Sequence, residues 1–161
     1  MANVRIQPSR ALAVYKSDDA DIPFPAEAYK GQTTAAGASQ LIDAGANFPA
    51  LQIYPGNIVY NLSTGAAATI IDVSPATPTI LTLNVNIFGA LEDYIIYQSS
   101  PMAGGQNTGC VLYVGTGGDV KVTTAGNDVV TFVDVQNGSF LPVQVVKVWD
   151  IGASADILAL W

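Results

Sequence analysis

The sequence contains no histidine, and this absence limits the chemistry open to the chain. Histidine is the commonest general base and the usual partner of serine and cysteine nucleophiles. Cys110 is the single cysteine, so it has neither an imidazole to activate it nor a second thiol for an intrachain disulfide. We therefore expect a chain that is not an enzyme and has no cofactor, with Cys110 as a small buried residue at the start of a strand.

Charged residues are scarce as well, at 12% of the chain against a usual ~25%. Lys and Arg number 6 against 13 Asp and Glu, and the basic residues are too scattered for a nucleic-acid footprint or an anionic membrane surface. These basic residues are Arg5, Arg10, Lys16, Lys30, Lys121 and Lys147. A weakly charged surface suits repeated subunit contacts, because few charges must be desolvated. The alternative is a monomer with a polar, uncharged surface.

Long apolar runs are missing too. No stretch approaches the about 18 apolar residues of a membrane helix, and residues 1–5 lack the apolar segment of a signal peptide. We therefore expect a protein made in the cytoplasm, where a fold without disulfides is the rule. Hydrophobic residues still make up 50% of the chain, which is enough for a real core.

What the sequence does contain is the rhythm of an all-β protein. Short apolar stretches alternate with Gly, Asn, Asp and Pro punctuation, and no helix is predicted. Asn137-Gly138 is a strong hairpin signal. The predicted strands are 4–6, 11–15, 57–61, 66–73, 79–83, 93–97, 111–114, 119–124, 129–133, 143–149 and 156–160.

Two stretches of small and polar residues, 31–39 and 99–109, are predicted to be flexible joints. They bracket a middle block with enough apolar residues for one small core, which has the content of a compact barrel or small sandwich. The predicted core residues are Phe48, Ile53, Val59, Ile70, Leu81, Leu83, Phe88 and Tyr94.

The strand at 143–149 is mainly apolar on both of its faces. One face of an antiparallel sheet is often in contact with water, so a strand of this kind indicates cover from another layer or another subunit.

Three patterns could bind ligands, and each has a simpler interpretation. Asp18, Asp19 and Asp21 could bind Ca²⁺, but the spacing of a calcium loop is missing and a solvated turn is the default. The segment 115–119 lacks the ending of a phosphate loop and predicts a tight turn. Nine aromatic residues could form sugar-stacking platforms, although most are expected in strands and core. They are Tyr15, Tyr29, Tyr54, Tyr60, Tyr94, Tyr97, Tyr113, Trp149 and Trp161.

The C-terminal block resembles the small spike-base and head-decoration proteins of tailed bacteriophages and gene transfer agents. The matching segments are Leu112-Tyr-Val-Gly115, Gly118-Asp-Val-Lys-Val122, Thr123-Thr-Ala-Gly126, Val130-Thr-Phe132, Gly138-Ser-Phe-Leu-Pro142, Val145-Val-Lys-Val-Trp149 and Ile157-Leu-Ala-Leu-Trp161. The N-terminal segments Pro8-Ser-Arg-Ala-Leu-Ala-Val14 and Ser17-Asp-Asp-Ala-Asp-Ile-Pro23 are similar to the leader of that family. In the family this leader runs almost directly into the Leu-Tyr-Val-Gly segment.

The resemblance implies a discontinuous β-sandwich host domain, residues 1–27 plus 109–161, with a small β-barrel-like domain inserted at 28–108. It implies a non-enzymatic virion protein that decorates or cements the outer surface of a capsid. The expected partners are the major capsid protein, further copies of the chain, and a spike or fibre protein or a host surface glycan. The alternatives are a carbohydrate-binding module for host attachment and a tail or baseplate protein. The residues predicted to form the interface are Val143, Val145, Val146, Val148, Trp149, Leu160 and Trp161.

Overall fold

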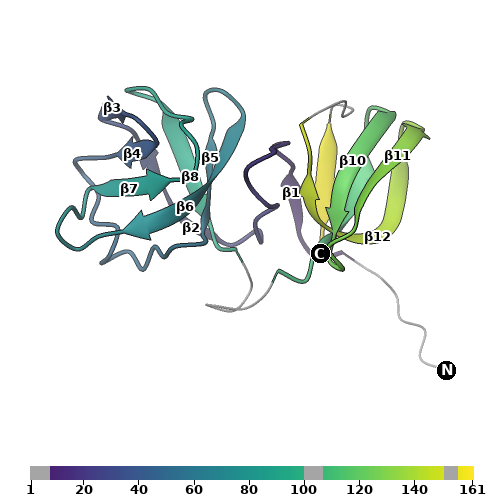
Figure 1. The fold of residues 1–161 in the computed structure, drawn as a ribbon, viewed down its shortest axis with the longest axis horizontal. Coiled ribbons are helices and arrows are strands. Elements are labelled where there is room, and N and C mark those ends of the chain that lie inside the picture. The colour runs from purple at the N-terminus through teal and green to yellow at the C-terminus, as the bar shows by residue number, and fades with distance from the viewer. Residues whose placement is uncertain (1–7, 100–106, 151–155) are drawn as a thin grey trace.

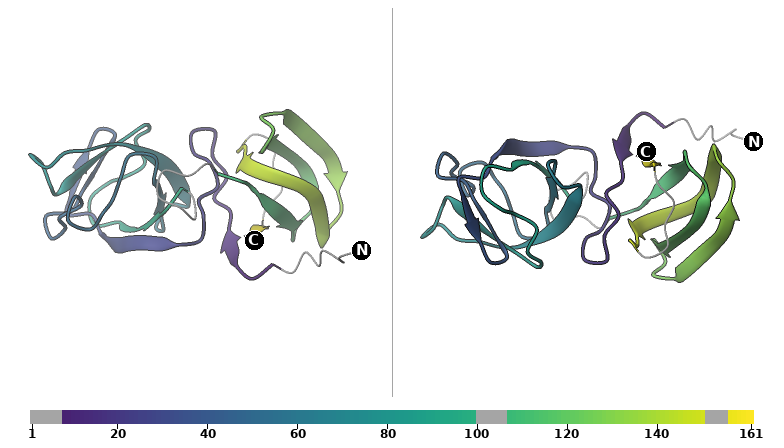
Figure 2. Two further views of the ribbon diagram at one scale, coloured as in Figure 1. Left: turned by 90° about the horizontal axis from the view of Figure 1, so that it is seen from below. Right: turned by 90° about the horizontal axis from the view of Figure 1, so that it is seen from above.

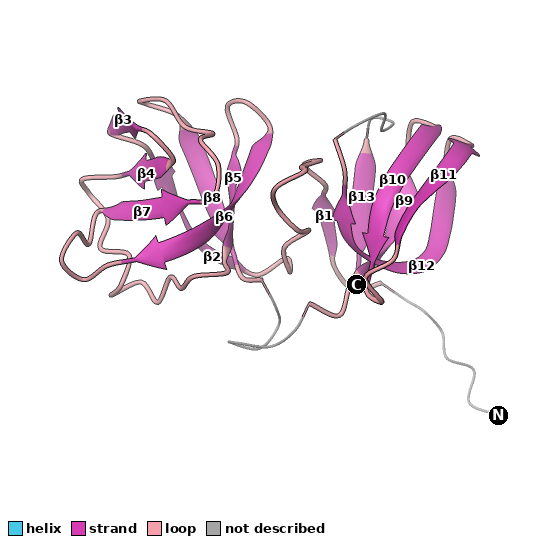
Figure 3. Ribbon diagram, viewed as in Figure 1, coloured by secondary structure: helices cyan, strands magenta, loops and turns pink. Residues whose placement is uncertain are grey.

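The computed structural model describes residues 8–99, 107–150 and 156–161, and this part of the chain is all-β, as predicted. Its strands form two antiparallel sheets, consistent with a β-sandwich, and no described residue lies in a helix (Figure 3). It follows that the described residues include no helix able to cross a membrane. The predicted strand at 4–6 and most of the predicted joint at 99–109 lie outside the described residues.

The first sheet has six strands and draws them from both ends of the chain. Its strand order is β1-β13-β9-β12-β10-β11, so the N-terminal strand pairs with the last strand. The bounds are β1 (Ala11–Ala13), β9 (Cys110–Val114), β10 (Gly118–Thr124), β11 (Val129–Val135), β12 (Ser139–Val148) and β13 (Ile157–Leu160).

Alternation along these strands gives the six-stranded sheet one core face and one outer face. Cys110, Leu112 and Val114 on β9 are buried, whereas the residues between them are only partly buried. The side chains of the core face pack into one cluster. Its buried members are Ile22, Cys110, Leu112, Val114, Val120, Val122, Leu141, Val145, Val148, Ile157 and Ala159.

The second sheet has seven strands, in the order β2-β8-β5-β6-β7-β4-β3, and it does not close into a barrel. All eight residues predicted to form the core of the middle block are buried in one cluster, five of them on strands of this sheet and three in its loops. The bounds are β2 (Glu27–Gln32), β3 (Ala35–Gly37), β4 (Gln40–Ile42), β5 (Ile58–Asn61), β6 (Ala66–Val73), β7 (Ile80–Leu83) and β8 (Asp93–Tyr97).

The prediction of a flexible joint at 31–39 is wrong, because this stretch contains the end of β2 and the whole of β3. A glycine stands at position 31 because packing leaves no room for a side chain, and not because the chain is flexible there. A Cβ atom there would lie 2.8 Å from both Asp43 Oδ2 and the Tyr94 hydroxyl oxygen. The Tyr94 hydroxyl donates a hydrogen bond to Asp43 Oδ2 at 2.7 Å, and both side chains are buried. Glycine is therefore required where the strand passes over this buried pair.

The hairpin prediction at Asn137-Gly138 is also wrong in its pairing. A turn does form there, and Gly138 adopts a φ of +76°, which favours glycine. However, the strands on either side of the turn are β11 and β12, and β10 lies between them in the sheet. The hairpin partner of β10 is β11, across the turn at 125–128.

The two sheets lie side by side along the long axis of the molecule, with residues 14–22 between them (Figures 1 and 2). We call residues 14–22 the strap. The main chain of the strap donates from Ser17 to Val148 O and from Ile22 to Val146 O, along the second half of β12. On its other side, Asp19 O accepts a hydrogen bond from Asn84 Nδ2 at 2.7 Å. The strap therefore joins both sheets.

An apolar cluster seals this junction. Tyr15 of the strap stacks on Tyr60 of β5 with ring centroids 4.3 Å apart. The buried members of the cluster are Ala20, Ile58, Tyr60, Ala67 and Ile95. The cluster combines strap residues with the seven-stranded sheet, so burial of apolar surface holds the two sheets together.

Candidate functional site

The outer face of the six-stranded sheet carries an uncovered row of apolar side chains. Strand register places Phe140 opposite Tyr113, Tyr113 opposite Leu158, and Leu158 opposite Ala13. These four residues therefore cross β12, β9, β13 and β1 as direct neighbours. Phe140 is 60% exposed and Leu158 is 38% exposed. The centroids of the Phe140 and Tyr113 rings are 5.3 Å apart.

A second row runs beside the first. Val111 lies opposite Leu160, and Leu160 lies opposite Ala11. Val111 and Leu160 are half-buried and Ala11 is exposed. We call the two rows together the apolar face. None of its residues carries a charge, so covering it with another surface would bury apolar area without desolvating an ion.

Sequence reasoning found only Leu160 of this face. The available signal was the alternation within the last strand and within 111–114, where apolar residues occupy both faces. Register decides which of these outward residues meet, and register depends on pairing across the whole sheet. Phe140, Tyr113 and Leu158 could not be grouped without it.

Three of the predicted interface residues are buried inside the chain itself. Val145 and Val148 belong to the core of the six-stranded sheet, and Val146 is 9% exposed. The strap pairs by main-chain hydrogen bonds with the part of β12 that no longer pairs with β9, and Ile22 of the strap packs in the same core cluster as Val145 and Val148. These residues therefore offer no surface to a partner.

The other predicted interface residues are only partly exposed. Val143 and Trp161 pack against the same core. Trp149 Nε1 donates to Thr123 Oγ1 at 3.0 Å, and the Lys121 ammonium lies 4.5 Å from the Trp149 ring centroid. Trp149 is thus held by its own sheet, and its contact with a partner stays a prediction.

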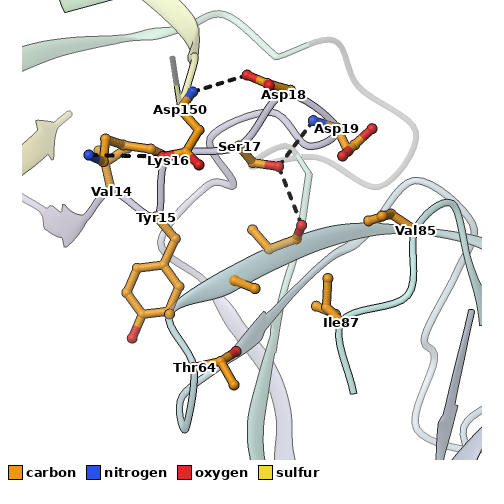
Figure 4. Close-up of a pocket in the computed structure, with 13 residues that line it drawn as sticks. Val14, Tyr15, Lys16, Ser17, Asp18, Asp19, Thr64, Val85, Ile87 and Asp150 are labelled. Atoms are coloured by element: carbon orange, nitrogen blue, oxygen red, sulfur yellow. Dashed lines mark hydrogen bonds and ion pairs between the residues drawn. The ribbon is translucent and has the colours of Figure 1, made fainter. Parts of the chain in front are cut away.

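A groove with a volume of about 510 Å³ opens at the junction of the two sheets (Figure 4). One wall is the strap, and the other is the turn before β6 together with the loop after β7. The lining residues are Val14, Tyr15, Lys16, Ser17, Asp18, Asp19, Thr64, Gly65, Ala66, Ala67, Val85, Ile87 and Asp150.

Ser17 fixes the shape of the strap wall. Its buried hydroxyl accepts hydrogen bonds from the backbone N–H groups of Asp19 and Ala20, each at 3.1 Å. The same hydroxyl donates to Ala67 O on β6 at 3.4 Å. This turn directs the exposed side chains of Asp18 and Asp19 outward while the serine itself stays buried.

Charged side chains lie along the rim of the groove. Asp18 Oδ1 accepts a hydrogen bond from the Asp150 backbone N–H at 3.1 Å, and Lys16 Nζ lies 4.0 Å from Asp150 Oδ1. Asp21 instead pairs with Lys147, at 3.7 Å. The three aspartates weighed for Ca²⁺ are therefore split between different contacts, and the described residues contain no cluster of metal-ligating side chains.

The aromatic residues considered as sugar platforms fall into different environments. Tyr60 and Tyr94 are buried, so they cannot stack on a ligand from solvent. Tyr54 is 53% exposed and is not among the residues that line the groove. Among the nine candidates, Tyr15 is the one that lines the groove.

Cys110 is a free, buried thiol at the start of β9, as predicted. Burial raises the pKa of this thiol, and a hydrogen bond with the main chain of Leu160 lowers it by less. The net result is a rise in the pKa from 9.0 to about 12. The thiol therefore stays protonated at neutral pH and is a poor nucleophile.

The raised pKa predicts a loss of stability in alkali. The folded chain holds the thiol proton more tightly than the unfolded chain, so this contribution is complete below pH 9.0 and is lost as pH rises toward about 12. By pH about 10.5 the free energy of unfolding should fall by about 2 kcal/mol from this group. Urea unfolding at several pH values should show a smaller alkaline loss in Cys110→Ala, and an equal loss would contradict the assignment.

Burial also raises the tyrosine pKa values at Tyr60 and Tyr94, and the hydrogen bond to Asp43 adds to the effect at Tyr94. Within the described residues, the Tyr60 hydroxyl has no hydrogen-bond partner of ordinary geometry. Its burial raises its pKa, and among the described residues the main chain of Tyr15 is the one group that lowers this pKa. Both tyrosines start from 10.0, so their share of the alkaline loss begins at higher pH than that of Cys110.

Comparisons of the chain with models of protein families, with curated proteins and with solved structures found no match. The resemblance to phage head proteins therefore stays an expectation that rests on the short sequence segments of the two ends of the chain.

Proposed function

We propose that the chain is a non-enzymatic structural protein of a virion, located on the outer surface of a tailed-phage head, where it decorates or cements the capsid. The observation that carries this proposal is the apolar face of the six-stranded sheet. Phe140, Tyr113 and Leu158 form a continuous uncharged surface there, and large exposed apolar surfaces mark contacts between proteins. The sequence resemblance points to the same use.

The domain division belongs to this proposal. The host domain is the discontinuous sandwich of residues 1–27 plus 109–161, and residues 28–108 form the inserted barrel-like domain. Strand membership supports this division, because every described strand between residues 27 and 97 belongs to the seven-stranded sheet. Barrel-like curvature is supported by β2 and β3, which follow each other in sequence yet stand at opposite ends of that sheet.

The proposed partners are further copies of the chain and the major capsid protein. Association through the apolar face would gain roughly 25 cal/mol for each Å² of apolar surface buried. Symmetry repeats the same contact many times on a particle, so a modest contact becomes an avid one. The projecting seven-stranded sheet would then remain available to a spike, a fibre or a host surface.

Non-enzymatic action is supported by the side chains at hand. The chain has no histidine, and its single thiol is buried with a raised pKa. A tail or baseplate location would use the same surfaces and differs only in where the protein sits on the particle.

Light scattering on the purified full chain over a range of concentrations tests the proposal. We expect a discrete closed oligomer, and binding of the chain to heads that lack it. A monomer at every concentration that also fails to bind heads would overturn the proposal. Immunogold labelling of particles separates the head location from the tail location.

A further inference from the structure

The groove at the junction of the two sheets combines polar and apolar walls. We propose that this groove binds a saccharide residue that is neutral or carries an amino group. The site goes beyond the structural role proposed above and does not depend on self-association, because the apolar face and the groove share no residue.

The groove has the size and position of a small-ligand site. Its volume of about 510 Å³ lies within the range of roughly 300–1,000 Å³ that is usual for such sites. Ligand sites also occur preferentially where two structural units meet, and here the strap supplies one wall and the seven-stranded sheet the other.

Unused polar groups stand on both walls. Within the described residues, the Asp19 carboxylate and the Thr64 hydroxyl make no side-chain hydrogen bond, and both residues are exposed. A carboxylate only accepts hydrogen bonds, whereas a threonine hydroxyl both donates and accepts. Hydroxyl groups of a sugar can do both, so a ring between the walls would satisfy Asp19 and Thr64 together.

The apolar part of the lining suits the C–H faces of a sugar ring. Val85 and Ile87 contribute aliphatic surface from the loop after β7. One face of the Tyr15 ring is covered by Tyr60, with an interplanar angle of 10°. Tyr15 is among the residues that line the groove, and an electron-rich ring attracts polarised C–H groups.

Charge narrows the ligand class. The lining holds three aspartates, Asp18, Asp19 and Asp150, against the single cation Lys16, which is close to Asp150. The excess negative charge disfavours uronic acids and phosphorylated sugars and favours an amino sugar. Such attraction between exposed groups weakens as salt rises. A simple cation has neither the hydroxyl groups nor the apolar ring face of a sugar, so it would satisfy the aspartates but not Thr64 or the apolar lining.

The test is an NMR titration of the ¹⁵N-labelled full chain with matched probes: methyl glucoside, glucosamine, glucuronate and Nα-acetyl-lysine amide. We expect methyl glucoside and glucosamine to shift the amide signals of Tyr15, Thr64 and Ile87, with the tighter binding for glucosamine at low salt. Glucuronate should leave them unchanged. Absence of shifts with both sugars at millimolar concentrations would overturn the proposal, and so would shifts of equal size with the lysine amide.

Variants then locate the site. Thr64→Val should weaken binding of methyl glucoside about five- to tenfold, the usual effect of losing one hydrogen bond. Asp19→Asn should weaken it as well, because a neutral amide oxygen replaces the charged acceptor. Asp72→Asn and Thr131→Val are matched controls, because both residues are exposed and neither lines the groove. Equal weakening by a control and by its partner would place binding elsewhere and contradict the assignment.

Discussion

Replacing Phe140 and Leu158 by threonine together should dissociate the oligomer that we expect in solution. Truncation of central interface residues commonly costs about 1–4 kcal/mol each, so the pair should weaken association by about 30-fold or more. Both side chains are exposed in the single chain, and threonine keeps the preference for strands. The free energy of unfolding of the monomer should therefore change by less than about 1 kcal/mol. Light scattering measures the first effect and urea unfolding the second.

A matched control lies on the same sheet. Val129 and Val133 are 54% and 73% exposed on β11, the strand at the far edge. The double replacement Val129→Thr with Val133→Thr should leave the oligomer intact, because these residues are outside the two rows of the apolar face. If this control dissociates the oligomer while the Phe140 and Leu158 variant does not, copies associate through the β11 edge instead.

Point variants are a better test than a C-terminal truncation. β13 pairs with both β1 and β9, and its residues Ile157 and Ala159 are buried in the core. Removing β13 would expose core side chains and leave β1 without a partner strand. Lost assembly after such a deletion would report unfolding of the sheet and not the loss of an interface.

The core of the middle block was predictable because it depends on local composition. Val59 and Leu81 are bulky residues in short strands and Ile53 is a bulky residue in the loop before β5, and burying them is favourable in almost any arrangement. The strands at 27–42 were missed for the opposite reason, since Gly31, Ala36 and Gly37 give little apolar signal. Leu41 in this region is fully buried, but the small and polar residues before it in the sequence gave no strand pattern.

Errors about pairing had a different cause. A two-residue turn such as Asn137-Gly138 reports how the backbone reverses and not which strand lies beside the next one. The second half of β12 pairs with the main chain of Ser17 and Ile22, more than a hundred residues away in sequence. The groove likewise joins the strap to Thr64 and Asp150. Contacts of this range depend on the whole fold, so strand patterns alone do not predict them.

Gly117→Ala should be the most damaging exchange of a single hydrogen for a methyl group in the six-stranded sheet. A Cβ atom at Gly117 would overlap Val135 O and would lie 2.8 Å from Asn137 Oδ1. The first of these atoms is main chain, so no change of rotamer relieves the overlap. The Gly117 N–H also donates to Asn137 Oδ1 at 2.6 Å, and displacing the turn would break this bond.

The turn after β11 is tied to the irregular register of the sheet. Gly118 pairs with Val135, whereas Val120 pairs with Phe132, so β11 has an extra residue between them. Asp134 takes a φ of +53° in this bulge, and its N–H donates to Asp119 Oδ1. A methyl group at Gly117 would push on this bulge, whose geometry is already restricted.

We expect Gly117→Ala to lower the free energy of unfolding by roughly 3 kcal/mol, the upper range for forcing an added methyl into a packed site. Gly126→Ala is the matched control on the same sheet, because its nearest atom would be Asp128 Oδ2 at 3.4 Å. It should change stability by less than about 1 kcal/mol. Trp149 and Trp161 follow strands of this sheet, so tryptophan fluorescence in urea reports its unfolding directly. Equal stability of the two variants would mean that the main chain at 135–137 moves aside freely, and the bulge would then be an adaptable edge and not a fixed part of the fold.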